Sequence, residues 1–157
     1  MKINWKLLIK CIAIPLIVGA VSGLLTRNAM MDFEVLNKPP LSPPAWLFPV
    51  VWTILYTLMG ISSYLVKTSG ADEKDIFDAL NIYFYQLVVN FLWPIFFFNF
   101  QWYLFSFVWL VLLWILVVQM IKRFDGISKA AAYLNIPYLL WLTFAAYLNF
   151  AIWWLNR

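Results

Sequence analysis

Five long apolar runs, separated by short polar segments, limit what this chain can fold into. They cover approximately residues 5–26, 45–66, 78–98, 102–121 and 130–155. A helix needs about 20 mainly apolar residues to cross the hydrocarbon of a bilayer, and each run has about that length. Only 11% of the residues are charged, whereas a soluble domain has about 25%. We therefore expect an all-α membrane protein, a bundle of five transmembrane helices in a single domain over residues 1–157.

The basic residues are divided unequally between the two ends of the expected bundle. Eight lie at the N-terminus or in the second and fourth connections: Lys2, Lys6, Lys10, Lys67, Lys74, Lys122, Arg123 and Lys129. Three lie at the opposite end: Arg27, Lys38 and Arg157. Short loops rich in Lys and Arg stay in the cytoplasm, so we expect a cytoplasmic N-terminus, with loop 27–44 and the C-terminus outside. The short chain favours a bacterial inner (cytoplasmic) membrane.

The scarcity of reactive side chains excludes several classes of function. The chain has no His and one Cys, so it can form no internal disulfide, no Cys/His metal cluster and no site with a His base. We expect no metal. All seven carboxylates fall in loops or at the expected helix ends, which weighs against a proton-driven pump. The net charge of +4 does not suggest a nucleic-acid partner; the bilayer is the expected partner surface.

A proline-rich segment leads into the second run. The stretch from Lys38 to Tyr56 reads KPPLSPPAWLFPVVWTILY. Proline fixes φ and lacks a backbone N–H, so the paired prolines form a stiff loop just before a helix. The aromatic residues that follow are Trp46, Phe48, Trp52 and Tyr56. Two interpretations remain open: an aromatic wall that holds a flat apolar ligand, or aromatic residues at a membrane interface.

Polar and aromatic residues inside the runs suggest an interior cavity. Gln86, Asn90 and Asn149 should face inward, because an unpaired polar group in hydrocarbon is costly. They could join helices by hydrogen bonds or orient a ligand in a mostly apolar cavity. Trp52, Trp93 and Trp141 lie well inside their runs. They could pack the bundle or contact a large planar ligand.

Two glycines in the first run, Gly19 and Gly23, are four residues apart. Small residues at this spacing let two membrane helices approach closely. The approaching helix could belong to the same bundle or to a second copy of the chain. A homodimer is therefore one possible assembly.

Three groups of residues together resemble the TspO/MBR family of translocator and tryptophan-rich sensory proteins. The first group is Lys38-Pro39, Pro43-Pro44, Phe48, Trp52, Leu55-Tyr56 and Met59-Gly60. The second group, in the third run, is Gln86-Leu87, Asn90 and Trp93. The third group, in the fifth run, is Pro137-Tyr138, Trp141, Phe144-Ala145 and Leu148-Asn149. The resemblance extends over nearly the whole chain.

The resemblance implies a five-helix bundle, often dimeric, that binds porphyrins such as protoporphyrin IX. The ligand would lie inside the bundle beneath loop 27–44, with no other cofactor required. Eukaryotic members also bind cholesterol and synthetic isoquinoline-carboxamide or benzodiazepine ligands. Residues carried over by motif as the ligand-binding lining are Pro44, Phe48, Trp52, Asn90, Trp93, Tyr138, Trp141 and Ala145.

The family leaves more than one function open. A membrane receptor for porphyrins and related flat apolar ligands is the first expectation. The alternatives are a light-dependent porphyrin-degrading enzyme, in which Trp52 and Trp141 would be the catalytic residues, and a transporter of tetrapyrroles or lipids. Modulation of a partner protein is a fourth.

The chain departs from the family pattern at two places. Asp32-Phe33 stands where the family often has Trp or Tyr before Leu-x-Lys-Pro, so a hydroxyl that could meet the ligand is missing. The end of the fifth run lacks the Tyr and basic residue of the sterol motif, so cholesterol recognition by that motif is not expected. Arg27 or Lys38 could meet the propionates of a porphyrin, or both could simply be solvated.

Overall fold

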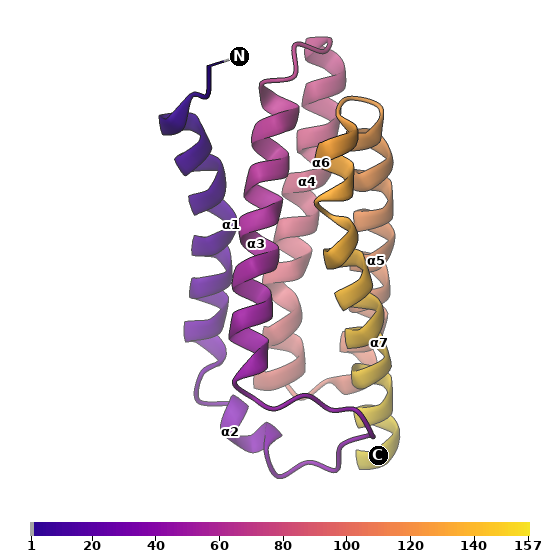
Figure 1. Cartoon of the computed structure of the whole chain (residues 1–157). Coiled ribbons are helices and arrows are strands. Elements are labelled where there is room, and N and C mark those ends of the chain that lie inside the picture. Colours follow the sequence, from indigo (N-terminus) through magenta and orange to yellow (C-terminus); the bar gives the residue numbers. More distant parts are fainter. Residues whose placement is uncertain (1) are drawn as a thin grey trace.

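The structure is a computed structural model that describes residues 2–157. Five long helices run up and down in an all-helical bundle (Figure 1). They are α1 (Trp5–Thr26), α3 (Leu47–Lys67), α4 (Glu73–Pro94), α5 (Tyr103–Asp125) and α7 (Ile136–Asn156). Three short elements accompany them: α2 (Met30–Phe33), the π-helical turn η1 (Ile95–Asn99) and α6 (Lys129–Tyr133). Five helical segments are long and apolar enough to cross a membrane, so the predicted fold class is confirmed.

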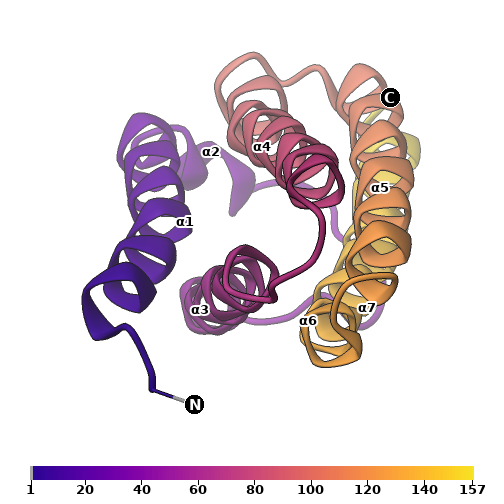
Figure 2. The same cartoon turned by 90° about the horizontal axis from the view of Figure 1, so that it is seen from above.

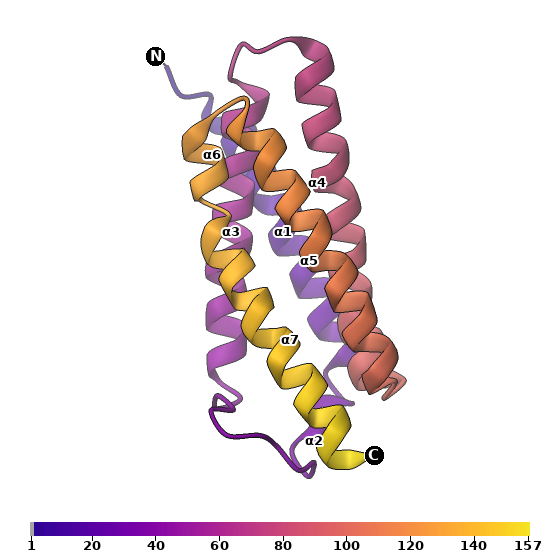
Figure 3. The same cartoon turned by 90° about the vertical axis from the view of Figure 1, so that its right-hand side faces the viewer.

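The helices form an asymmetric bundle. Seen from above, α1 lies at one side and α5 and α7 at the other, with α3 and α4 between them (Figure 2). Helix α1 packs mainly on α3, and α7 packs along α5, beside which it lies in Figure 3. The N-terminus and the α3–α4 and α5–α6 turns lie at one end, while the C-terminus and the α2 segment lie at the other (Figure 1). The eight basic residues counted above thus lie toward one end and the other three toward the opposite end.

The outer surface is apolar and several polar side chains are inside. On α1, Ile9, Ile17 and Leu24 are 64%, 60% and 65% exposed, whereas Gln86 and Asn149 are 0% and 1% exposed. Water would favour the opposite distribution, while lipid chains solvate large aliphatic side chains and cannot hydrogen bond. The bundle is therefore arranged for a bilayer.

Helix α4 begins five residues before the expected start at residue 78. Glu73 and Asp75 lie in its first turn, where the positive end of the helix dipole stabilises carboxylates. Pro94, the last residue of α4, is followed directly by η1. Proline provides no N–H for the α-helical hydrogen bond to Asn90. Within the turn that follows, the N–H of Phe100 donates to the carbonyl of Ile95, five residues back, at 3.1 Å, which is the spacing of a π-helix.

The other helix boundaries also differ from expectation. Helix α3 begins at Leu47 rather than residue 45, and α5 continues to Asp125 rather than ending at 121. The segment expected as one helix over 130–155 is divided into α6 and α7. Near the division, the buried Asn135 donates from its Nδ2 atom to Ser62 Oγ at 2.9 Å and to the Ala131 carbonyl at 3.0 Å.

Glycines allow α1 and α3 to lie close together. A Cβ atom at Gly60 would collide with the backbone of Cys11 and Ile12. A Cβ atom at Gly19 would collide with the ring of Tyr56, whereas Gly23 faces open space. Gly19 and Gly60 therefore serve contacts inside one bundle, and a homodimer stays a prediction.

Candidate ligand-binding site

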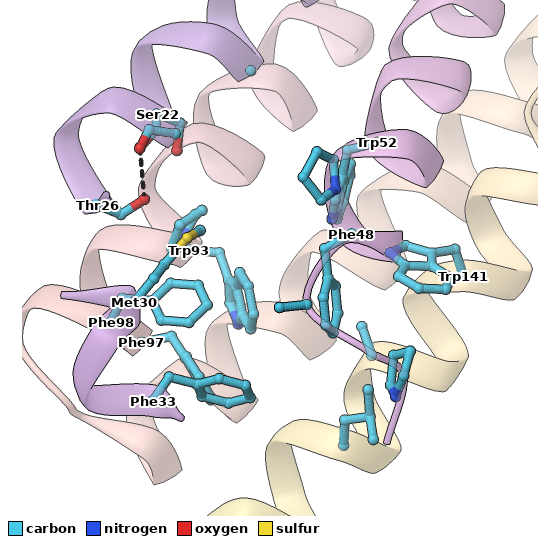
Figure 4. Close-up of a pocket in the computed structure, with 18 of the residues that line it drawn as sticks. Ser22, Thr26, Met30, Phe33, Phe48, Trp52, Trp93, Phe97, Phe98 and Trp141 are labelled. Carbon is cyan, nitrogen blue, oxygen red and sulfur yellow. Dashed lines mark hydrogen bonds between the residues drawn. The ribbon is translucent and has the colours of Figure 1, made fainter. Parts of the chain in front are cut away.

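A cavity of about 510 Å³ lies in the half of the bundle nearest α2. Its walls come from α1, α3, α4, η1 and α7, and residues of the connection between α2 and α3 line one end. Aromatic side chains from several elements border it (Figure 4). Small-molecule sites usually occupy about 300–1,000 Å³ and are mostly apolar with a few polar groups, so the cavity has the size and character of a ligand site.

Two aromatic walls line the cavity. On α3, Phe48 and Trp52 are four residues apart and so share a face of the helix. The Phe48 ring lies 5.9 Å from that of Trp141 on α7. On α4, Trp93 stacks on Phe97 with ring centroids 5.0 Å apart. These rings present broad faces and edges of the kind that pack against a planar aromatic molecule.

A chain of hydrogen bonds crosses the bundle beside the cavity. The Tyr56 hydroxyl donates to Asn90 Oδ1 at 3.0 Å, and Asn90 Nδ2 donates to the Tyr138 hydroxyl at 2.7 Å. Tyr138 in turn donates to Gln86 Oε1 at 2.8 Å. Tyr56 and Asn90 line the cavity, while Gln86 and Tyr138 lie behind them. Because every link is buried and paired, the network fixes the orientation of the Asn90 amide.

The three cavity tryptophans differ in their hydrogen bonding. The Trp93 indole N–H donates to Asn149 Oδ1 at 3.0 Å, and Asn149 Nδ2 donates to the Tyr103 carbonyl at 2.8 Å. Within residues 2–157, the indole N–H groups of Trp52 and Trp141 have no such protein acceptor. Asn149 of α7 is thus hydrogen bonded to both α4 and α5. The indole N–H groups of Trp52 and Trp141 can donate to a ligand.

Six of the eight predicted ligand-binding residues line the cavity: Phe48, Trp52, Asn90, Trp93, Trp141 and Ala145. Pro44 does not, although its neighbours Pro43 and Ala45 do. Tyr138 does not line it either; it is 1% exposed, with its hydroxyl bonded to Asn90 and Gln86. The structure brings the six together, and their role in binding stays a prediction.

The prediction omitted the wall made by α1 and the aromatic end near α2. Gly23 and Thr26 of α1 line the cavity, together with Phe33, Phe97 and Phe98. Phe33 replaces the larger aromatic residue of the family pattern, and its ring lies 5.5 Å from Phe98. The run of three phenylalanines at 96–98 was a visible signal. Helix α1 carried a weaker signal, because Ser22 and Thr26 are polar residues four positions apart in a mainly apolar run, and both are buried beside the cavity.

The connection between α2 and α3 is held against α7. Tyr147 donates its hydroxyl proton to the Pro40 carbonyl at 2.9 Å. Asn156 hydrogen bonds to the backbone of Asn37. Since residues of this connection line one end of the cavity, these contacts fix the position of that end.

The fold and the cavity together define a class: helical membrane proteins with five spans and a tryptophan-lined internal cavity. The sequence profile of the TspO/MBR family matches residues 11–155. The chain belongs to the TspO/MBR family, which confirms the resemblance seen in its motifs, and it is an integral membrane protein.

Relatives of bacterial and mammalian origin align with most of the chain. The tryptophan-rich protein TspO of Chlorobaculum tepidum is 40% identical over 147 residues, 93% of each chain. The translocator protein of Ovis aries is 38% identical over 126 residues, 80% of this chain and 75% of the sheep protein. The tryptophan-rich sensory protein of Cereibacter sphaeroides is 32% identical over 161 residues, 99% of this chain and 95% of the relative.

Proposed function

We propose that the protein is a membrane receptor for porphyrins of the protoporphyrin IX type and related flat apolar ligands. The observation that carries the proposal is the cavity of about 510 Å³ with Trp52, Trp93 and Trp141 in its walls. Aromatic residues that serve a membrane interface lie at the level of the lipid headgroups, which does not explain three tryptophans around one internal cavity. A planar ligand there would gain about 0.5–1.5 kcal/mol per well-placed aromatic contact, beyond the burial of its surface.

The proposal is tested by titrating the purified protein with protoporphyrin IX and following the ligand's own absorbance and fluorescence. Two such aromatic contacts correspond to about 1–3 kcal/mol. Phenylalanine keeps a smaller aromatic ring at each position, so we expect the double variant Trp52→Phe/Trp141→Phe to lose about half of this and to bind about fivefold more weakly. Trp114→Phe is the matched control, because Trp114 faces outward and donates to Thr143 Oγ1 at 2.9 Å. No spectral change with the unaltered protein, or equal affinities for both tryptophan variants, would contradict the proposal.

Light-dependent degradation of the bound porphyrin is a second candidate. It is favoured by the position of Trp52, which lines the cavity with its ring 5.4 Å from that of Tyr56 and 6.1 Å from that of Tyr138. Trp52 and Trp141 would both border a bound porphyrin, which would itself absorb the light. Illumination with a stoichiometric porphyrin, followed by chromatography, tests the idea. The degradation product should require the protein and disappear in the double tryptophan variant.

We further propose a cytoplasmic N-terminus in a bacterial inner membrane, with the α2 end outside. The support is the excess of Lys and Arg at the N-terminal end of the bundle. In a Cys11→Ser background, Val35→Cys and Ser69→Cys place single thiols at opposite ends. An impermeant maleimide added to intact spheroplasts should label the thiol at 35 at once and the thiol at 69 only after permeabilisation. The reverse pattern would overturn this orientation.

A further inference from the structure

Lys38 is the only cationic side chain that lines the cavity among the described residues. Its Nζ atom donates to the backbone carbonyl of Glu34 at 2.9 Å and lies 5.0 Å from the centre of the Phe33 ring. An ammonium group has three N–H donors, so this contact leaves donors free. In residues 2–157 the one side-chain ion pair is Lys74–Asp78, at the other end of the bundle. Lys38 therefore has no carboxylate partner.

The other two basic residues at this end are placed differently. Arg27 follows α1 directly and does not line the cavity. Arg157 lies over the ring of Trp154 at 3.6 Å and donates from Nε to the Trp154 carbonyl at 3.2 Å. Of the three cations, only Lys38 is placed to meet a molecule in the cavity.

The backbone around Lys38 is held in place. Asn37 is bonded to Asn156 through both of its backbone polar groups. Pro39 and Pro40 follow, with φ fixed by their rings, and the Pro39 carbonyl accepts from Ser42 Oγ at 2.8 Å. The backbone of Lys38 is therefore already ordered, so binding a ligand would cost less conformational entropy than if this segment were flexible.

We propose that Lys38 makes the cavity selective for flat ligands that carry a carboxylate at one edge. The inference rests on the proposed function and adds the ligand's charge to it. The apolar body would lie among the tryptophans and its carboxylate would accept hydrogen bonds from Lys38. A charged hydrogen bond is stronger than a neutral one. Because Lys38 is also exposed to water, we expect the carboxylate to improve affinity by about fivefold, near the upper limit for a solvent-exposed ion pair.

Glu34 gives the proposal a second, independent variant. Glu34 also lines the cavity, and it is the single acidic residue there among the described residues. A negative charge beside the ligand's carboxylate opposes binding. Glu34→Gln should therefore strengthen the binding of an acidic ligand and leave a neutral one unaffected, the opposite of the change expected at Lys38.

The test compares protoporphyrin IX with its dimethyl ester, in micelles of a zwitterionic detergent so that no anionic lipid competes. We expect the unaltered protein to bind the free acid about fivefold more tightly than the ester, and Lys38→Met to lose this preference. Arg27→Met is the charge-matched control and should keep the preference. Unchanged affinity for the ester would show that each variant is folded with its cavity intact.

The outcomes separate the two proposals. If neither porphyrin binds the unaltered protein, the proposed function fails and this inference fails with it. If both bind equally well, or if Lys38→Met keeps the preference for the acid, the role of Lys38 is overturned while porphyrin binding stands. Loss of the preference in both Lys38→Met and Arg27→Met would also overturn it, since general electrostatic attraction would then suffice.

Discussion

The side-chain amide of Asn156 hydrogen bonds to both backbone polar groups of Asn37. Its Oδ1 atom accepts from the Asn37 N–H at 3.0 Å, and its Nδ2 atom donates to the Asn37 carbonyl at 2.9 Å. The two residues are 119 positions apart in the chain, and this pair joins the last turn of α7 to the connection that lines the end of the cavity. We expect a ligand to enter and leave at this end, which would require the connection to move and the pair to break.

Asn156→Ala should therefore accelerate ligand exchange. Losing two partly exposed hydrogen bonds costs about 1 kcal/mol, which corresponds to about a fivefold larger population with the connection released. We expect association and dissociation rates, measured by stopped-flow porphyrin fluorescence, both to rise about that much while the affinity changes little. Arg157→Ala, which alters contacts within the same helix end only, should leave both rates unchanged. A slower exchange would exclude this role.

Tyr138→Phe should destabilise the bundle and leave the cavity wall in place. The change removes the hydroxyl that joins Asn90 to Gln86, so a buried amide on each side loses a partner. Contacts of this kind average about 0.6 kcal/mol in membrane proteins, and unpaired buried groups cost more. We expect a loss of about 1–2 kcal/mol in unfolding by SDS. Tyr133→Phe, at an exposed position, is the control and should have no effect.

Gly60→Ala should weaken the packing of α1 on α3. The new methyl group meets the backbone of Cys11 and Ile12, which cannot rotate away as a side chain can. Overpacking of this kind costs about 1–3 kcal/mol, measurable as a lower melting temperature in detergent. A variant as stable as the original would mean that α1 is free to shift outward without loss.

Gly23→Ala should leave the packing of α1 on α3 intact. Nothing lies within 4 Å of a Cβ atom at this position, so stability should be unchanged or slightly higher, since alanine favours helix more than glycine. Gly23 lines the cavity, however, and the methyl group would project toward a ligand. We expect weaker binding of protoporphyrin IX by titration, with no fall in melting temperature. A fall would show that residue 23 contacts a neighbouring helix.

The five spans were predictable because apolar length alone identifies a membrane helix. Their ends were less predictable. Glu73 and Asp75 are charged residues typical of a loop, but they lie in the first turn of α4, where the helix dipole stabilises carboxylates. The division between α6 and α7 falls just before Pro137, in the first turn of α7, and proline supplies no N–H to continue the helix from α6. The bond from Asn135 Nδ2 to Ser62 Oγ in α3 accompanies this division. A single sequence contains no record of such a contact between distant segments.

The site was predictable where lipid forces a side chain inward. Asn90, Trp52 and Trp141 stand well inside their spans and line the cavity. Sequence spacing could not tell that Pro43 rather than Pro44 lines it, because loop side chains follow no fixed period. Tyr138 was predicted from its motif to line the site; it is buried, but its hydroxyl is bonded between two amides behind the wall.

The π-helical turn after Pro94 also shapes the cavity. Phe97 and Phe98, both in this turn, line the cavity. A π-helical turn accommodates an extra residue and rotates the side chains that follow it. The aromatic rim near Phe33 thus contains residues of an irregular stretch of main chain, and a substitution that restored regular α-helix there would change the direction of the phenylalanine rings.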